Sequence, residues 1–174
     1  DTEVIVHLIA TSRASTVIDR VTDALRQVEG AYSLVALTED SLIGVRDPHG
    51  VRPLVLGKFE DSYVLASESC ALDIIGADFI RDVEPGELIV IRDGEISSYH
   101  PFIKTPSRFC IFEYVYFSRP DSVVEGTSVY DARKKIGAEL ARESPVDVDM
   151  VIPVPDSGVP AAIGFAAESG IPFE

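Results

Sequence analysis

The sequence predicts an α+β region followed by an α/β region. Over residues 1–100, two stretches with helical periodicity precede short apolar runs joined by turn residues, the pattern of an antiparallel meander. After Pro101, apolar runs alternate with helical stretches, as they do in a parallel sheet. A polar, proline-containing stretch at residues 101–108 separates the two patterns. We therefore expect two domain parts, residues 1–105 and residues 106–174.

The first region should contain three helices. Asp1 can cap the first of them, and apolar residues follow it at helical spacing. A second apolar stripe predicts a helix over residues 15–28, which Gly30 ends. A short helix is expected at residues 69–76.

Hairpins should make up the rest of the first region. They are expected over residues 32–45, 52–67 and 88–97. The third has Asp93-Gly94 at its turn, the strongest short hairpin signal in the chain, because these residues tolerate the backbone angles that a two-residue turn requires.

The second region should contain two buried strands, each followed by a helix. The strands are expected at residues 110–117 and 148–154, and the helices at residues 131–143 and 160–169. Gly170 ends the last helix, and the residues after it resemble the start of another strand. Because the chain starts at a helix cap and stops at a strand entrance, we expect a fragment cut from a longer protein at both ends.

The composition excludes several classes of protein. A formal net charge of −14 argues against non-specific nucleic-acid binding, because that affinity comes from Lys and Arg side chains that neutralise phosphates. No apolar run reaches the roughly 18 residues that a membrane-spanning helix needs. The two cysteines, Cys70 and Cys110, form neither a CxxC unit nor a disulfide framework, so we expect reduced thiols inside the cell.

Few residues are candidates for chemistry. Asp156 and Ser157 lie where a predicted strand ends and a helix begins, the usual ligand position in parallel sheets. Their oxygens suit a metal ion or a phosphate, but helix capping is the favoured interpretation. Asp1 either caps its helix or binds the ammonium group of an amino-acid substrate. Cys110 is interpreted as a small buried hydrophobe, and residues 119–122 as a turn.

Seven stretches, taken together, resemble one enzyme family. They are residues 1–3 (DTE), 30–33 (GAYS), 46–54 (RDPHGVRPL), 66–71 (ASESCA), 83–87 (VEPGE), 112–122 (FEYVYFSRPDS) and 154–157 (VPDS). The earlier stretches fit class II glutamine amidotransferases in general. The aromatic stretch that ends in SRPDS resembles the amidophosphoribosyltransferase family in particular, and the resemblance covers essentially the whole chain.

The resemblance implies a fold and a reaction. Residues 1–105 would be the second half of an N-terminal-nucleophile glutaminase, an αββα sandwich, and residues 106–174 the start of a type I phosphoribosyltransferase parallel sheet. Members of the family hydrolyse glutamine and transfer the ammonia to phosphoribosyl pyrophosphate, giving 5-phosphoribosylamine in the first step of purine nucleotide biosynthesis. The resemblance also implies feedback inhibition by purine nucleotides, a cytoplasmic location and a homo-oligomer, a tetramer when full length.

The resemblance assigns roles to three residues. Asp1 matches the aspartate that binds the α-amino group of glutamine, and Ser157 matches a position linked with Mg²⁺. Cys110 matches the first cysteine ligand of the [4Fe–4S] cluster in members that have one. The family's nucleophilic cysteine and its acidic phosphoribosyl pyrophosphate loop have no counterpart in this chain. We therefore expect no catalytic residue within it, and neither glutaminase nor transferase activity from the chain alone.

Two other interpretations remain open from the sequence. The chain could come from another class II glutamine amidotransferase, in which an unrelated domain replaces the phosphoribosyltransferase part; residues 110–158 would distinguish that case. It could instead be a non-catalytic, acidic, β-rich binding module, which should fold stably as it stands.

Overall fold

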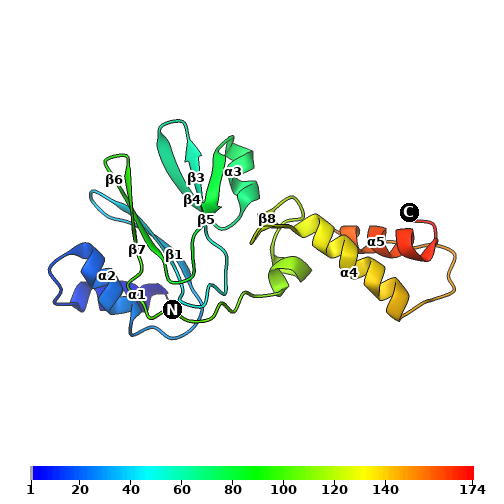
Figure 1. Ribbon diagram of the computed structural model, residues 1–174, viewed down its shortest axis with the longest axis horizontal. Helices are drawn as coiled ribbons and strands as arrows, with labels where there is room; N and C mark the ends of the chain where they lie inside the picture. Colours follow the sequence, from blue (N-terminus) through cyan, green and yellow to red (C-terminus); the bar gives the residue numbers. More distant parts are fainter. Residues whose placement is uncertain (1) are drawn as a thin grey trace. The chain divides into compact units, whose positions relative to one another are not determined.

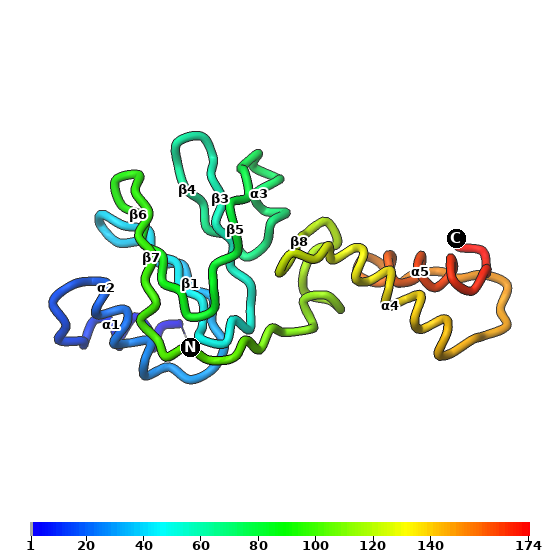
Figure 2. Tube along the Cα trace, viewed as in Figure 1, coloured from blue at the N-terminus to red at the C-terminus, as the bar shows by residue number. Residues whose placement is uncertain are grey.

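The computed structural model describes residues 2–174, so the expected cap and ligand residue Asp1 lies outside the described residues. The chain forms two compact units. Unit 1 comprises residues 2–51 and 84–108, and unit 2 comprises residues 52–83 and 109–174. The colours of Figures 1 and 2 follow the chain through both units. The expected domain boundary between residues 105 and 106 stays a prediction.

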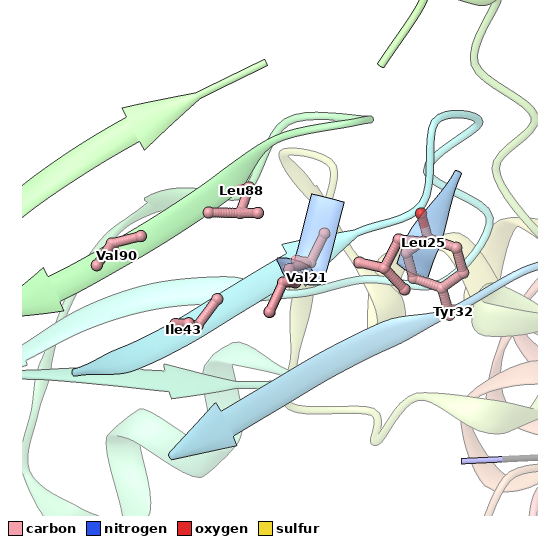
Figure 3. Packing of buried hydrophobic residues seen from close by; sticks show 7 residues of the cluster. Val21, Leu25, Tyr32, Ile43, Leu88 and Val90 are labelled. Carbon is pink, nitrogen blue, oxygen red and sulfur yellow. The ribbon is translucent and has the colours of Figure 1, made fainter. Parts of the chain in front are cut away.

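Unit 1 combines two helices with a four-stranded antiparallel sheet. Its elements are α1 (Thr2–Thr11), α2 (Val17–Leu25), β1 (Ser33–Leu37), β2 (Leu42–Arg46), β6 (Leu88–Arg92) and β7 (Glu95–Tyr99), with the strands in the order β1-β2-β6-β7 (Figure 1). Thr16 caps α2, because its hydroxyl accepts a hydrogen bond from the Asp19 N–H at 3.1 Å. The core, shown in Figure 3, consists of Val21, Leu25, Tyr32, Ile43, Val45, Leu88 and Val90.

Tyr32 is the polar member of this core. Its hydroxyl is buried and has no hydrogen-bond partner among the described residues. Burial, with a smaller contribution from the negative charge of Asp47, raises the pKa of Tyr32 to about 12. The folded state therefore keeps this hydroxyl neutral at pH values where an unfolded chain has already lost the proton.

We expect Tyr32→Phe to change the alkaline limb of the stability curve. The pKa of Tyr32 is raised on folding, so its contribution to stability is complete below pH 10 and is lost as the pH rises from 10 to about 12. The phenylalanine variant should lose less stability over that interval, measured as the melting temperature against pH. Tyr99→Phe, at an exposed position, is the control. Parallel curves for the wild type and Tyr32→Phe would contradict the expectation.

The first part of unit 2 is a three-stranded antiparallel sheet with one short helix. Its elements are β3 (Val55–Phe59), β4 (Ser62–Ala66), α3 (Ser69–Ile75) and β5 (Asp78–Asp82), with the strands in the order β4-β3-β5. Val55, Leu72 and Ala77 form its small core. Gly57 lets α3 approach the sheet, because a Cβ there would lie 2.7 Å from the methyl carbons of Leu72.

The second part of unit 2 is mostly helical. It contains a π-helix, η1 (Glu113–Phe117), and a short hairpin whose strands β8 (Val123–Val124) and β9 (Thr127–Ser128) have two residues each. The helices α4 (Val129–Glu143) and α5 (Val159–Ser169) follow. α4 and α5 lie side by side (Figures 1 and 2). Their backbones approach closely at Gly137 and Gly164. None of the helices of residues 2–174 has the combined length and apolar character needed to cross a membrane.

Most of the expected elements are confirmed. The helices expected at residues 15–28, 69–76, 131–143 and 160–169 are present with shifted ends, and so are all three hairpins. The α+β character of the first region is confirmed as well. Strand β5 was not expected, because charged residues flank its short apolar centre.

One strand prediction is wrong, and a second is confirmed only in part. Residues 110–117 contain the π-helix η1, because periodicity cannot separate a strand from a helix in a short apolar run. In residues 148–154, Val151 forms one parallel bridge with Phe173, and no strand is present. The parallel pairing expected for the second region is therefore limited to this bridge within the described residues.

Candidate functional site

The residues that the sequence singled out lie in different places. Asp1 is outside the described residues. Ser157 is half-buried in the turn before α5. Cys110 is half-buried with a free thiol, and it does not line the cavity at Ser157. The structure therefore does not bring Cys110 and Ser157 into one site.

Ser157 lines a cavity of about 370 Å³ within unit 2. The end of η1, the turn after it, one residue of α4 and the turn before α5 supply the walls. The lining residues are Tyr116, Phe117, Ser118, Arg119, Pro120, Arg133, Pro155, Asp156 and Ser157. Aromatic rings, two guanidinium groups, hydroxyls and one carboxylate thus surround a space large enough for a small polar ligand.

Asp156 and Ser157, the two candidate ligands in the turn before α5, do not cap that helix with their side chains. The N-cap residue of α5 is Gly158, and no side chain forms a cap hydrogen bond there. A Cβ at Gly158 would lie 2.7 Å from the Val154 carbonyl oxygen, so this position requires glycine. The expectation that Asp156 or Ser157 caps the helix is therefore wrong.

Arg119 and Asp121 form a two-bond ion pair beside the cavity. The Arg119 Nε donates to Asp121 Oδ1 at 3.0 Å, and Nη2 donates to Oδ2 at 2.8 Å. The hydrogen bonds from Arg119 lower the pKa of Asp121 and raise that of Arg119. Both side chains are exposed, so the pair orients the guanidinium group more than it stabilises the fold.

Two buried charged side chains hold the wall of the cavity. Arg133 is 2% exposed and donates to the carbonyl oxygens of Tyr114 and Ser118, each at 2.7 Å. Glu113 is 1% exposed, accepts from the Ser118 hydroxyl at 2.7 Å and pairs with Arg52. Burial lowers the pKa of Arg133, and the negative charge of Glu68 opposes that effect. These contacts fix η1 and the turn that follows it.

The turn at RDPHG in unit 1 is organised by two other buried charged residues. Asp47 accepts hydrogen bonds from the backbone N–H groups of His49 (2.9 Å) and Val51 (3.1 Å). Arg46 donates to the Gly50 carbonyl oxygen at 2.9 Å. Gly50 has a φ of 59°, and a Cβ there would lie 2.7 Å from Pro85. The motif thus folds into a rigid loop, because its charges satisfy its own backbone.

The turn before α5 carries oxygen donors of the kind that Mg²⁺ takes. Asp156 and Ser157 supply a carboxylate and a hydroxyl oxygen on one turn, the ligand types that Mg²⁺ takes together with phosphate oxygens. A [4Fe–4S] cluster is held by a set of cysteine thiolates, of which Cys110, with its free thiol, could supply one. Within residues 2–174, no group of three or more His, Cys, Asp or Glu residues could hold a metal ion.

Sequence reasoning did not single out Arg133, Glu113 or Glu68. One available signal was the spacing on α4, where Arg133 lies four residues from both Val129 and Gly137, on its buried face. A charged residue among small and apolar neighbours indicates a satisfied, structural charge. The partners of Glu113 and Glu68 have no comparable local signal.

Comparison with known proteins gives one match to part of the chain and others to its whole length. Residues 1–73 match the family described as "Glutamine amidotransferase domain". The amidophosphoribosyltransferase of Rhizobium etli is 58% identical over 100% of this chain and 36% of its own length. That of Methanocaldococcus jannaschii is 46% identical over 99% of this chain and 40% of its own length.

A solved structure agrees with these relatives. The glutamine phosphoribosylpyrophosphate amidotransferase from B. subtilis, complexed with ADP and GMP, superposes with a TM-score of 0.96 and 46% identity, over 100% of this chain and 38% of that one. The chain thus spans little more than a third of the length of these relatives. The similarity includes residues 110–158, the segment that distinguishes this family from other class II amidotransferases. The chain belongs to the amidophosphoribosyltransferase family.

Proposed function

We propose that this chain is part of an enzyme that moves nitrogen from glutamine to phosphoribosyl pyrophosphate. Glutamine and water give glutamate and ammonia; ammonia and phosphoribosyl pyrophosphate then give 5-phosphoribosylamine and pyrophosphate. This reaction would open purine nucleotide biosynthesis. The observation that carries the proposal is 58% identity to an amidophosphoribosyltransferase over the whole chain, beyond the amidotransferase match at residues 1–73.

The two half-reactions divide between the two proposed domain parts. Residues 1–105 would belong to the glutaminase, with Asp1 binding the α-amino group of glutamine. Residues 106–174 would belong to the transferase, where the cavity at Ser157 would receive anionic oxygens of phosphoribosyl pyrophosphate beside Arg119. Asp156 and Ser157 would hold Mg²⁺, which when bound offsets the charge of the departing pyrophosphate.

Regulation and assembly complete the proposal. The B. subtilis relative was solved with ADP and GMP, which supports purine nucleotides as feedback inhibitors here. The family resemblance supports a cytoplasmic homotetramer for the full-length protein. Cys110 would contribute one ligand if that protein holds a [4Fe–4S] cluster.

The test is a full-length chimera in which residues 1–174 replace the aligned segment of the Rhizobium etli relative. We expect the chimera to release pyrophosphate only when both glutamine and phosphoribosyl pyrophosphate are supplied. Ser157→Ala should lower that rate by about tenfold, as expected for the loss of one ligand contact, while glutamate release persists. Pyrophosphate and glutamate are measured in parallel.

The controls separate the alternatives. The 174-residue chain by itself should show neither activity, since the family's nucleophilic cysteine has no counterpart in its sequence. A chimera that hydrolyses glutamine but forms no pyrophosphate would favour another class II amidotransferase. A chimera with neither activity would overturn the proposal and favour a binding module.

A further inference from the structure

Two segments of unit 2 meet through hydrogen bonds, although one lies inside the amidotransferase match and the other outside it. The first, residues 66–70, joins β4 to α3 within the matched residues 1–73. The second, residues 118–123, runs from the end of η1 to β8. The second segment supplies three of the residues that line the cavity at Ser157. Contacts between the two segments therefore link the proposed glutaminase part to the proposed transferase cavity.

Glu68 makes the central contact. It occupies the N-cap position of α3, yet its side chain does not cap that helix. Its Oε2 instead accepts hydrogen bonds from the Arg119 backbone N–H and from the Ser122 hydroxyl, both at 2.8 Å. The neighbouring Ser69 hydroxyl accepts from the Val123 N–H at 2.8 Å. A carboxylate at a helix start thus accepts hydrogen bonds from a distant turn instead of capping its own helix.

The carboxylate of Glu68 binds the backbone N–H of Arg119 and not the Arg119 side chain. The Arg119 guanidinium is engaged by Asp121. The buried Arg133 provides a positive charge that interacts with Glu68. Glu68 therefore sets where the backbone of Arg119 lies relative to α3, and with it the wall of the cavity.

A second contact also joins residues inside the amidotransferase match to residues outside it. Arg52, within the matched residues, pairs with the buried Glu113 of η1 and lies over the ring of Phe117 at 4.6 Å. Phe117 also lines the cavity. Two independent charged contacts thus place η1 and its following turn against the amidotransferase part of the chain.

We propose that Glu68 is a positioning residue that keeps the sites of the two half-reactions correctly placed for ammonia transfer, an inference that rests on the proposed function. Ammonia that escapes to water at neutral pH is protonated and loses the lone pair needed for attack, so the transfer depends on how the two sites are held together. Loosening the 118–123 segment should let ammonia escape. It should not remove either set of reacting groups.

The test uses Glu68→Ala and Glu68→Gln in the full-length chimera. The measured quantity is pyrophosphate formed per glutamate formed, together with pyrophosphate formation from added ammonium salt. We expect Glu68→Ala to lower the ratio about tenfold, with glutamate release and ammonium-dependent synthesis within about twofold of the unmodified chimera. Glu68→Gln keeps an oxygen acceptor and should recover part of the ratio. Glu143→Ala, at an exposed position of α4, should leave all three rates unchanged.

An unchanged ratio in Glu68→Ala would overturn the inference, and so would an equal fall of all three rates, since that pattern indicates a structural role alone. A second measurement is independent of activity. In the 174-residue chain, Glu68→Ala should speed hydrogen exchange of the Arg119 amide about tenfold, because the charged acceptor of that N–H is gone. Unchanged exchange there would contradict the inference. If the unmodified chimera is inactive, the proposed function fails and the exchange measurement still decides whether Glu68 holds the turn.

Discussion

Gly137→Ala should destabilise unit 2 by about 3 kcal/mol, the upper part of the range for overpacking a tight contact. A Cβ at this position would lie 1.8 Å from the Ala161 carbonyl oxygen of α5, a backbone atom that can move only with its helix. Intrinsic helix propensity acts in the opposite direction and favours alanine over glycine by about 1 kcal/mol. The steric effect should therefore decide the sign.

Urea unfolding followed by circular dichroism measures this effect as a lower transition midpoint. Gly164→Ala should act similarly, since its Cβ would lie 2.0 Å from the Lys134 carbonyl oxygen. Ala167→Ser, at an exposed position of α5, is the control and should change the midpoint little. A Gly137→Ala variant as stable as the wild type would show that α4 and α5 do not pack at this distance.

Arg133→Met should cost about 3 kcal/mol of stability, within the range expected for breaking a buried charged contact. Methionine fills much of the volume of the arginine side chain but donates no hydrogen bond. The carbonyl oxygens of Tyr114 and Ser118 would both lose the donor that now lies 2.7 Å away. Because these carbonyls belong to η1 and its following turn, the cavity at Ser157 should lose its fixed wall.

The measurement is the unfolding free energy together with hydrogen exchange over residues 112–119. Exchange in that segment should accelerate more than the global loss of stability explains. Lys135→Met, an exposed position on α4, is the matched control. Equal stability and equal exchange in Arg133→Met would show that the buried guanidinium is dispensable.

Local patterns in the sequence predict the parts of the fold that local physics determines. The turn at Asp93-Gly94 needs two positive φ angles, and both residues have them, at 52° and 76°. Helices α2 and α4 begin at a hydroxyl residue, Thr16 and Ser128, that caps the first turn. Such signals lie within a few residues of the element that they specify.

The parts that the sequence does not predict depend on distant partners. No sequence pattern near Glu113 indicates that this residue pairs with Arg52. Without knowledge of that contact, the run of aromatic and β-branched residues around Glu113 is typical of a strand. Glu68 and Arg119 are likewise far apart in sequence and meet only in the folded chain. Of the candidate site residues, Ser157 does line a cavity, but its neighbours Arg119 and Arg133 became visible only in the structure.

The path of nitrogen through the full-length chimera shows whether the two half-reactions are joined. The substrate is glutamine labelled with heavy nitrogen in its amide group, supplied with phosphoribosyl pyrophosphate and an excess of unlabelled ammonium salt. We predict that the 5-phosphoribosylamine formed carries mostly the heavy nitrogen, read by mass spectrometry directly after quenching. Product nitrogen that follows the composition of the bulk ammonium pool would show that the two half-reactions are not joined.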